Sequence, residues 1–250
     1  MITCKSEREL MYMREAGKVA AEALAKLASA VRPGVTTKEL DRLAEEYIRS
    51  CGARPAFKGL YGFPATICSS VNEEVVHGIP GLRKLENGDI ISIDIGTEVN
   101  GYFGDSAVTF PVGTVSEEAL RLIKVTEESF YAGIAKARVG NRLSDISSAI
   151  QQYVEDRGFS VVRDYVGHGI GSSMHEEPQV PNFGKPGRGP RLQAGMTLAI
   201  EPMVNMGTYE VHTLPDNWTV VTKDRKLSSH FEHTIAITDS EPEVLTRLYI

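Results

Sequence analysis

The segment 89–110 constrains the fold of this chain more than any other. Two arms rich in β-branched residues flank Asn100-Gly101, the dipeptide most typical of a tight β-hairpin turn. If the turn has two residues, the numbers of paired residues sum to 201. Asp94 and Asp105 are then diagonal neighbours on one face of the hairpin, with Cβ atoms roughly 7 Å apart.

The surroundings of these two carboxylates favour a metal site. Ser92 and Gly96 share their face, while Ile91, Ile93 and Ile95 point the other way. Two carboxylates at this spacing suit a pair of hard cations about 3.5–4 Å apart. A loop of odd length would separate the two side chains, and a hairpin with two unrelated surface acids is the alternative explanation.

Length and composition exclude several classes of protein. The 250 residues are 42% hydrophobic and 24% charged, which is ordinary for a globular chain of one large domain or two small ones. The net charge of -6 argues against a nucleic-acid-binding surface. Cys4, Cys51 and Cys68 are too few for a disulfide framework. No signal peptide and no membrane span is recognisable, so we expect a cytoplasmic protein without a membrane partner.

Start and stop signals predict two pairs of helices. Capping boxes at Ser6 and Thr36 open helices that end near Pro33-Gly34 and Gly52, and further helices are expected at 116–138 and 143–157. Residues 53–65 indicate an irregular loop, 66–71 a strand and 76–81 a turn, and further strands are expected at 196–201 and 230–238. The fold class is therefore α+β, with mainly antiparallel strands covered by helices on one face.

The pattern repeats within the chain. A shift of 106 residues places Gly34 on Gly140, Leu40 on Ile146, Tyr47 on Tyr153 and Gly52 on Gly158, and a shift of one more places Asp94 on Glu201. We interpret residues 1–250 as a single domain with two similar halves, about 1–111 and 112–250, each with two helices followed by a ligand-bearing hairpin.

The second half supplies the remaining candidate ligands. His168 lies in GHGIG, Glu201 in AIEP and Glu232 in FEHT, all on predicted strands or glycine-flanked turns. A buried acid on such an element must be paired, protonated or metal-bound. Together with Asp94 and Asp105 they form a set of four carboxylates and one imidazole, which suits Mn, Fe(II), Co or Mg at least as well as Zn.

These five residues, in this order and context, match the ligand set of the methionine aminopeptidases, and the chain resembles the bacterial type I enzymes of that family. Glu201 and Glu232 are 31 positions apart (232 minus 201), whereas type II enzymes carry a long insertion between them. The resemblance covers essentially the whole chain and implies the pita-bread (creatinase/aminopeptidase) fold with two pseudo-symmetric halves. It also implies an enzyme that uses two divalent ions (Co, Mn, Fe(II) or similar) to remove the initiator methionine when the second residue is small.

The resemblance assigns roles residue by residue. Asp94 would bind one ion, His168 and Glu201 the other, and Asp105 and Glu232 would bridge both. Three residues would be catalytic: Glu201 as proton shuttle, His175 on the scissile carbonyl, and His77 beside the scissile nitrogen and the second substrate residue. His77 and His175 would therefore also bind substrate, as would Phe63, Cys68 and Trp218, with Leu60 and Met174, around the methionine side chain.

Its partners would be the N-termini of nascent proteins and peptides, with a ribosome contact near the exit of the nascent chain, and the enzyme would be a monomer. His212, His230 and His233 are expected to be structural or surface residues. Two alternatives stay open: an aminopeptidase that acts before proline, and a catalytically inactive pita-bread protein that serves as a binding module.

Overall fold

The structure is a computed structural model that describes residues 2–247. Its helices are α1 (Glu7–Ala30), α2 (Thr37–Ser50), α3 (Glu117–Ile134) and α4 (Leu143–Glu155), with a short 3₁₀ helix at Leu60–Gly62. Its strands are β1 (Arg54–Pro55), β2 (Ile67–Val71), β3 (Glu74–Val76), β4 (Ile90–Val99), β5 (Tyr102–Pro111), β6 (Ser160–Val161), β7 (Gly167–Gly169), β8 (Glu176–Val180), β9 (Thr197–Ile200), β10 (Met203–Asn205), β11 (Val211–Thr213), β12 (Val220–Thr222), β13 (Ser228–His230), β14 (Glu232–Ala236) and β15 (Glu243–Val244). Within the described residues, none of the helices combines the length and apolar character that a membrane crossing requires.

The predicted hairpin forms the centre of the fold. β4 and β5 pair with Val99 opposite Tyr102 and Asp94 opposite Ala107, as the two-residue turn requires. Asn100 and Gly101 both have positive φ angles, 52° and 81°, which is the conformation of the type I′ turns that match the twist of a hairpin. The two-residue loop and its register are therefore confirmed.

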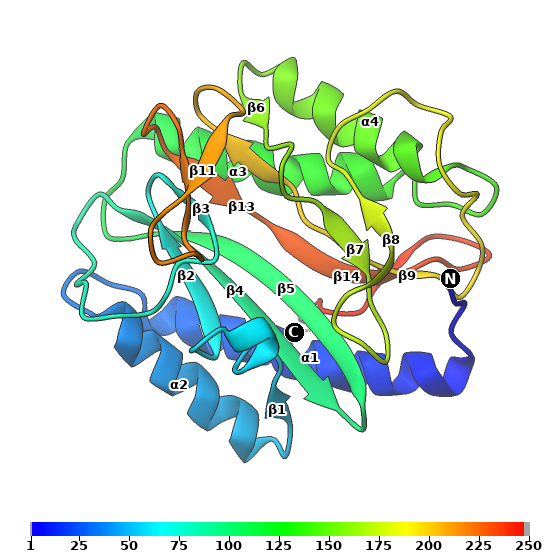
Figure 1. Cartoon of the computed structure of the whole chain (residues 1–250), viewed down its shortest axis with the longest axis horizontal. Helices are drawn as coiled ribbons and strands as arrows, with labels where there is room; N and C mark the ends of the chain where they lie inside the picture. The colour runs from blue at the N-terminus through cyan, green and yellow to red at the C-terminus, as the bar shows by residue number, and fades with distance from the viewer. Residues whose placement is uncertain (1, 248–250) are drawn as a thin grey trace.

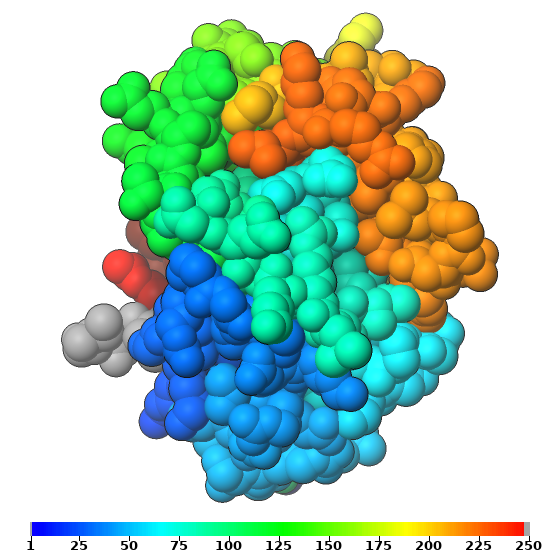
Figure 2. Space-filling model, turned by 90° about the vertical axis from the view of Figure 1, so that its left-hand side faces the viewer, coloured from blue at the N-terminus to red at the C-terminus, as the bar shows by residue number. Residues whose placement is uncertain are grey.

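One antiparallel sheet runs through the molecule in the order β1-β4-β5-β14-β9-β7-β8, with β2 also paired to β4 and β15 to β14. Two small sheets accompany it, β13-β10-β6 and β11-β12-β3. In Figure 2 the segment around β12 (orange) lies against the segment around β3 (cyan), in agreement with their antiparallel pairing.

The helices lie on one face of the main sheet (Figure 1). Ile93 and Ile95 of β4 pack with Leu24 of α1 and Leu40 of α2 in one buried cluster. A second cluster joins α3 and α4 to β9 and β14, and it includes Leu122, Ile146, Leu198, Ile200 and Ile235. Because strand side chains alternate between faces, Asp94 on β4 points away from the helices.

The two helix pairs have matching anchors. The hydroxyl of Tyr47 donates to Glu22 at 2.9 Å, and that of Tyr153 donates to Glu128 at 2.7 Å. Tyr153 lies 106 positions after Tyr47, and Glu128 lies 106 positions after Glu22. Gly34 and Gly140, related by the same shift, both have φ of 91°. The two helix pairs therefore share these local contacts at positions related by the 106-residue shift.

Local boundaries differ from the prediction in three places. The expected loop 53–65 contains β1 and the 3₁₀ helix, and the expected turn at 76–81 begins inside β3. The third helix ends at Ile134 and not at Arg138. β1 and β3 are held by partners distant in sequence, β4 and β12, so neighbouring residues carry little signal for them.

The second half does not end in a simple hairpin, and that prediction is wrong. β9 and β14 pair directly, with His233 opposite Ile200, but β10 to β13 lie between them in sequence. The inserted strands form parts of the two small sheets. The inserted segment contributes Met203, on β10, and Trp218, between β11 and β12, to the lining of the cavity described below.

Candidate metal centre

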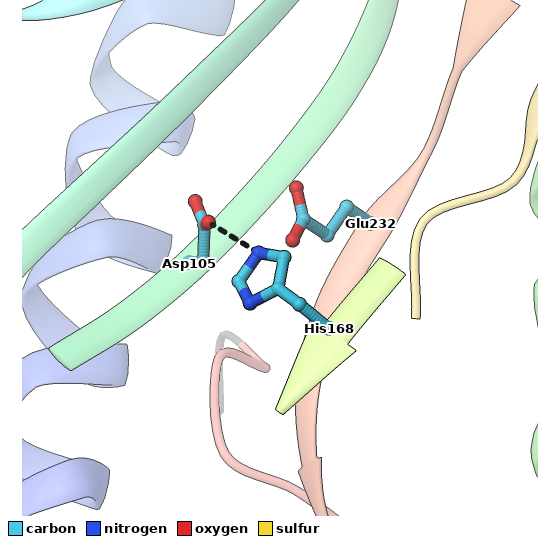
Figure 3. Close-up of side chains that lie close together, drawn as sticks. All are labelled: Asp105, His168 and Glu232. Carbon is cyan, nitrogen blue, oxygen red and sulfur yellow. Dashed lines mark ion pairs between the residues drawn. The ribbon is translucent and has the colours of Figure 1, made fainter. Parts of the chain in front are cut away.

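Five side chains from five different strands or strand ends meet on the face of the sheet that points away from the helices. Asp94 comes from β4, Asp105 from β5, His168 from β7 and Glu232 from β14, and Glu201 directly follows β9. Figure 3 shows Asp105, His168 and Glu232 converging from their strands. Since these strands are neighbours in the sheet, side chains more than a hundred residues apart become adjacent.

The ligand atoms of these side chains lie close together, but the distances between them are too long for hydrogen bonds. Nε2 of His168 lies 3.7 Å from Oδ2 of Asp105 and 3.6 Å from Oε1 of Glu201. Ligand atoms of Asp105, His168 and Glu232 lie within 4.8 Å of one another. Nδ1 of His168 lies 2.9 Å from the carbonyl oxygen of Gly169. Donation of a proton to that carbonyl leaves Nε2 unprotonated and directed at the acids, which is the usual arrangement of a metal-binding histidine.

The acids oppose one another electrostatically. Burial raises the pKa of Asp105 to about 8. Burial, and then the charge of Asp105, raises the pKa of Asp94, Glu201 and Glu232 well above their ordinary values. Burial lowers the pKa of His168, so this imidazole does not offset the negative charges as a cation. Bound cations stabilise the ionised form of buried carboxyl groups that have no positively charged neighbour.

The residues present fit divalent metal. Among the described residues, Asp94 Oδ1, Asp105 Oδ1 and Glu232 Oε1 are buried without a hydrogen-bond partner. Unpaired buried carboxylate oxygens are rare in folded proteins and costly unless they coordinate an ion. Oxygen donors with a neutral imidazole are suitable ligands for divalent transition metals.

The acids line a cavity of about 610 Å³, together with His77, His175 and aromatic side chains. The ring of His175 lies 4.4 Å from that of His168, centroid to centroid, and the ring of Tyr61 stacks with it at 5.7 Å. Burial lowers the pKa of both His77 and His175 to about 4, so both rings are neutral at pH 7. His77 has φ of 61°, a strained conformation for a residue other than glycine, of the kind that clusters at functional sites.

The residues expected around the methionine side chain lie together. Phe63, Cys68, Leu60 and Trp218 line the same cavity as the acids. The rings of Phe63 and Trp218 meet edge to face, 5.1 Å apart. Met174 belongs to the same apolar cluster but does not line the cavity.

The sequence predicts that His230 is a structural or surface residue; it is buried, but one of its polar atoms is not satisfied within the part of the chain that the structure describes. Its Nε2 is buried without a hydrogen-bond partner among the described residues, 3.7 Å from Oε2 of Glu201 and 3.9 Å from Oε2 of Glu232. The sequence held a signal for this position. His230 lies two residues before Glu232, so an extended chain points both side chains the same way. Tyr61 and Tyr165, which pack against His175 and His77, were also missed, and no sequence pattern marks them.

Comparison with known proteins places this centre in a family. Residues 11–239 match metallopeptidase family M24. The chain therefore belongs to the M24 metallopeptidases. Within that family it belongs with the methionine aminopeptidases: it is 63% identical to the methionine aminopeptidase of Clostridium perfringens over 98% of this chain and 99% of that protein. It is also 59% identical to methionine aminopeptidase 1 of Bacillus subtilis, over 99% and 100% of the two chains.

Solved structures agree. The methionine aminopeptidase of Rickettsia prowazekii superimposes with a TM-score of 0.97 at 44% identity, over 99% of this chain and 100% of that one. The prolidase of Pyrococcus horikoshii shares the fold, with a TM-score of 0.80, but at 22% identity and over 64% of its own length. The pita-bread fold expected from the sequence is thus confirmed.

Proposed function

We propose that this protein is an aminopeptidase that removes the N-terminal methionine from proteins and peptides whose second residue is small, and that it uses two divalent ions. The observation that carries the proposal is the convergence of Asp105, His168, Glu201 and Glu232 in a cavity that Phe63 and Trp218 also line. Relatives named as methionine aminopeptidases, at up to 63% identity over the full chain, support it.

In this proposal Asp94, Asp105, His168, Glu201 and Glu232 hold the ions, with Asp105 and Glu232 shared between them. When bound, divalent cations lower the pKa of water and polarise a carbonyl group. The identity of the ions is Co, Mn, Fe(II) or a similar metal.

The remaining chemistry belongs to side chains of this protein. Glu201, with a raised pKa, would accept a proton from the attacking water and pass it to the leaving amine. His175, neutral at pH 7, would donate a hydrogen bond to the carbonyl oxygen as negative charge develops there. His77 would lie beside the scissile nitrogen. Phe63, Cys68 and Trp218 would enclose the methionine side chain, whose flexible thioether fills irregular apolar space.

A peptide panel tests the proposal. With one metal throughout, we expect Met-Ala-Ser to be cut far faster than Met-Phe-Ser, because a bulky second residue would displace the scissile carbonyl, and 1 Å of misplacement can cost ~10²-fold in rate. A first residue of norleucine should still be accepted, since one methylene is worth only about 1–3 kcal/mol in such a pocket. Lysine or glutamate in first position should fail because its charge would be buried without a partner.

Two outcomes would contradict the proposal. Faster cleavage of Ala-Pro-Ser than of Met-Ala-Ser would select a proline-directed enzyme. Failure to cut any peptide, combined with no uptake of metal by the metal-free protein, would indicate an inactive binding module.

The proposed substrates also set the proposed location. We propose a cytoplasmic, monomeric enzyme that acts on N-termini as they leave the ribosome, since the initiator methionine is exposed there first. Sedimentation of the purified protein alone tests the monomeric state, and sedimentation with ribosomes tests the ribosome contact.

A further inference from the structure

His230 is not among the expected metal ligands, yet its imidazole enters the metal centre. Its side chain is 2% exposed, and Nε2 is directed toward Glu201 and Glu232. Ligand atoms of Glu201, His230 and Glu232 all lie within 4.8 Å of one another. This group is distinct from the one formed by Asp105, His168 and Glu232, with which it shares Glu232.

The backbone of His230 is held on two sides. Its N–H donates to Oγ1 of Thr109 at 3.0 Å, and its carbonyl accepts from the same hydroxyl at 2.8 Å. Met203 of β10 pairs with His230 across the small sheet. The next residue, Phe231, donates its N–H to the carbonyl of Pro202 at 3.2 Å, where the chain passes from β13 to β14. These contacts fix the backbone position from which the imidazole of His230 extends, two residues before Glu232.

Glu201 lies between two imidazoles. Its Oε1 faces Nε2 of His168 at 3.6 Å, and its Oε2 faces Nε2 of His230 at 3.7 Å. A hydrogen bond between an imidazole and a carboxylate would bring the atoms to about 2.7–3.2 Å. Donor atoms that share an ion at about 2.0–2.2 Å lie roughly 3–4 Å apart. Both separations at Glu201 therefore fit shared ions better than direct hydrogen bonds.

We propose that His230 is a sixth protein ligand, and that its Nε2 binds, with Glu201 and Glu232, one of the two ions of the centre. Glu201 would then also be shared between the two ions, because its Oε1 faces His168 and its Oε2 faces His230. An imidazole at that site moves its metal preference toward Fe(II), Co, Ni or Zn and away from Mn and Mg, which favour oxygen donors. This inference rests on the dimetal centre of the proposed function.

Proton NMR of the protein loaded with two equivalents of Co(II) tests the proposal without a catalytic assay. Ring protons of a histidine bound to Co(II) shift far outside the normal range, and labelling with ring-deuterated histidine identifies them. We expect two such rings in the unaltered protein. His230→Gln should retain only one, and His168→Gln should retain only the other. His212→Gln, which removes an exposed imidazole from β11, should retain both.

Calorimetric titration gives a second measurement. Loss of groups that only support a metal ligand costs about 10–100-fold in affinity, so loss of a direct ligand should weaken one Co(II) site by at least ~100-fold in His230→Gln. The affinity for Mn should fall less, because glutamine offers an oxygen donor.

The outcomes separate this inference from the proposed function. One coordinated ring in the unaltered protein, lost in His168→Gln and kept in His230→Gln, would overturn the role of His230 and leave the proposed centre intact. No coordinated ring at all would overturn both. The ring count itself is made on the unaltered protein and does not depend on whether the variants fold; the variants assign each ring to a residue.

Discussion

Replacing Asp105 by asparagine would separate two effects of this buried carboxylate: its cost to the stability of the metal-free protein and its contribution to metal binding. Asp105 is 3% exposed. Its backbone N–H donates to Oγ1 of Thr234 at 2.9 Å, and its carbonyl accepts from that hydroxyl at 2.9 Å. Both contacts are independent of the Asp105 side chain, and asparagine has nearly the same shape as aspartate. Asp105→Asn therefore removes one negative charge and changes little else.

The magnitude follows from the pKa of this group, which burial raises from 3.8 to about 8. Between these values the folded, metal-free protein keeps a proton that the unfolded chain releases, so the free energy of unfolding falls as pH rises. The slope is about 1.4 kcal/mol per pH unit for one group. Across the window from 3.8 to about 8 this sums to roughly 6 kcal/mol as an upper limit, because the neighbouring Asp94 carboxyl shares the effect.

We therefore expect two opposite results in Asp105→Asn. Without metal, the variant should match the unaltered protein near pH 4 and become more stable than it by several kcal/mol at pH 8. With metal, the unaltered protein should gain stability from bound ions and the variant should not. The variant should also lose peptidase activity, since one shared carboxylate would serve both ions.

Urea unfolding of chelator-treated protein at pH 4, 6 and 8, followed by the same series with Co(II), measures both effects. Asp239→Asn, at an exposed position, is the control and should change neither series. A metal-free Asp105→Asn variant that is less stable than the unaltered protein at pH 8 would refute the reasoning about the buried charge. An active variant with full metal content would refute the shared ligand.

Three further substitutions test other parts of the account. Glu201→Gln can still coordinate weakly but cannot carry a proton, so kcat should fall by at least the ~10²–10⁴ typical of general acid–base groups, and near-normal turnover would remove Glu201 from the mechanism. His175→Ala should lower kcat by ~10²–10³ and change KM much less, because its proposed hydrogen bond would form with charge that appears in the transition state; an effect on KM alone would limit His175 to substrate binding. Gly101→Ala forces a side chain to adopt φ of 81° and should cost about 1–2 kcal/mol in urea unfolding, whereas Gly81→Ala, at a position without positive φ, should cost clearly less.

Features set by neighbouring residues were predictable from the sequence. The register of β4 and β5 follows from the two-residue turn, because Asn100 and Gly101 adopt positive φ more readily than other residues. The starts of α1 and α2 follow from capping boxes in which Glu9 and Glu39 accept hydrogen bonds from the N–H groups of Ser6 and Thr36. These interactions span three residues, so a short stretch of sequence contains all of their partners.

The tertiary structure alone decided which distant groups meet. β9 pairs with β14 across four intervening strands, and no local pattern marks β1 or β3. Glu201 and Glu232 could be named from their motifs, whereas His230 was indicated only by its position two residues before Glu232 on an extended chain. Its role depends on the change of sheet at Phe231 and on the contact of its backbone with Thr109, 121 positions earlier. The tertiary fold brings metal ligands together from distant parts of the chain, and sequence patterns identify only those ligands that lie in recognisable local motifs.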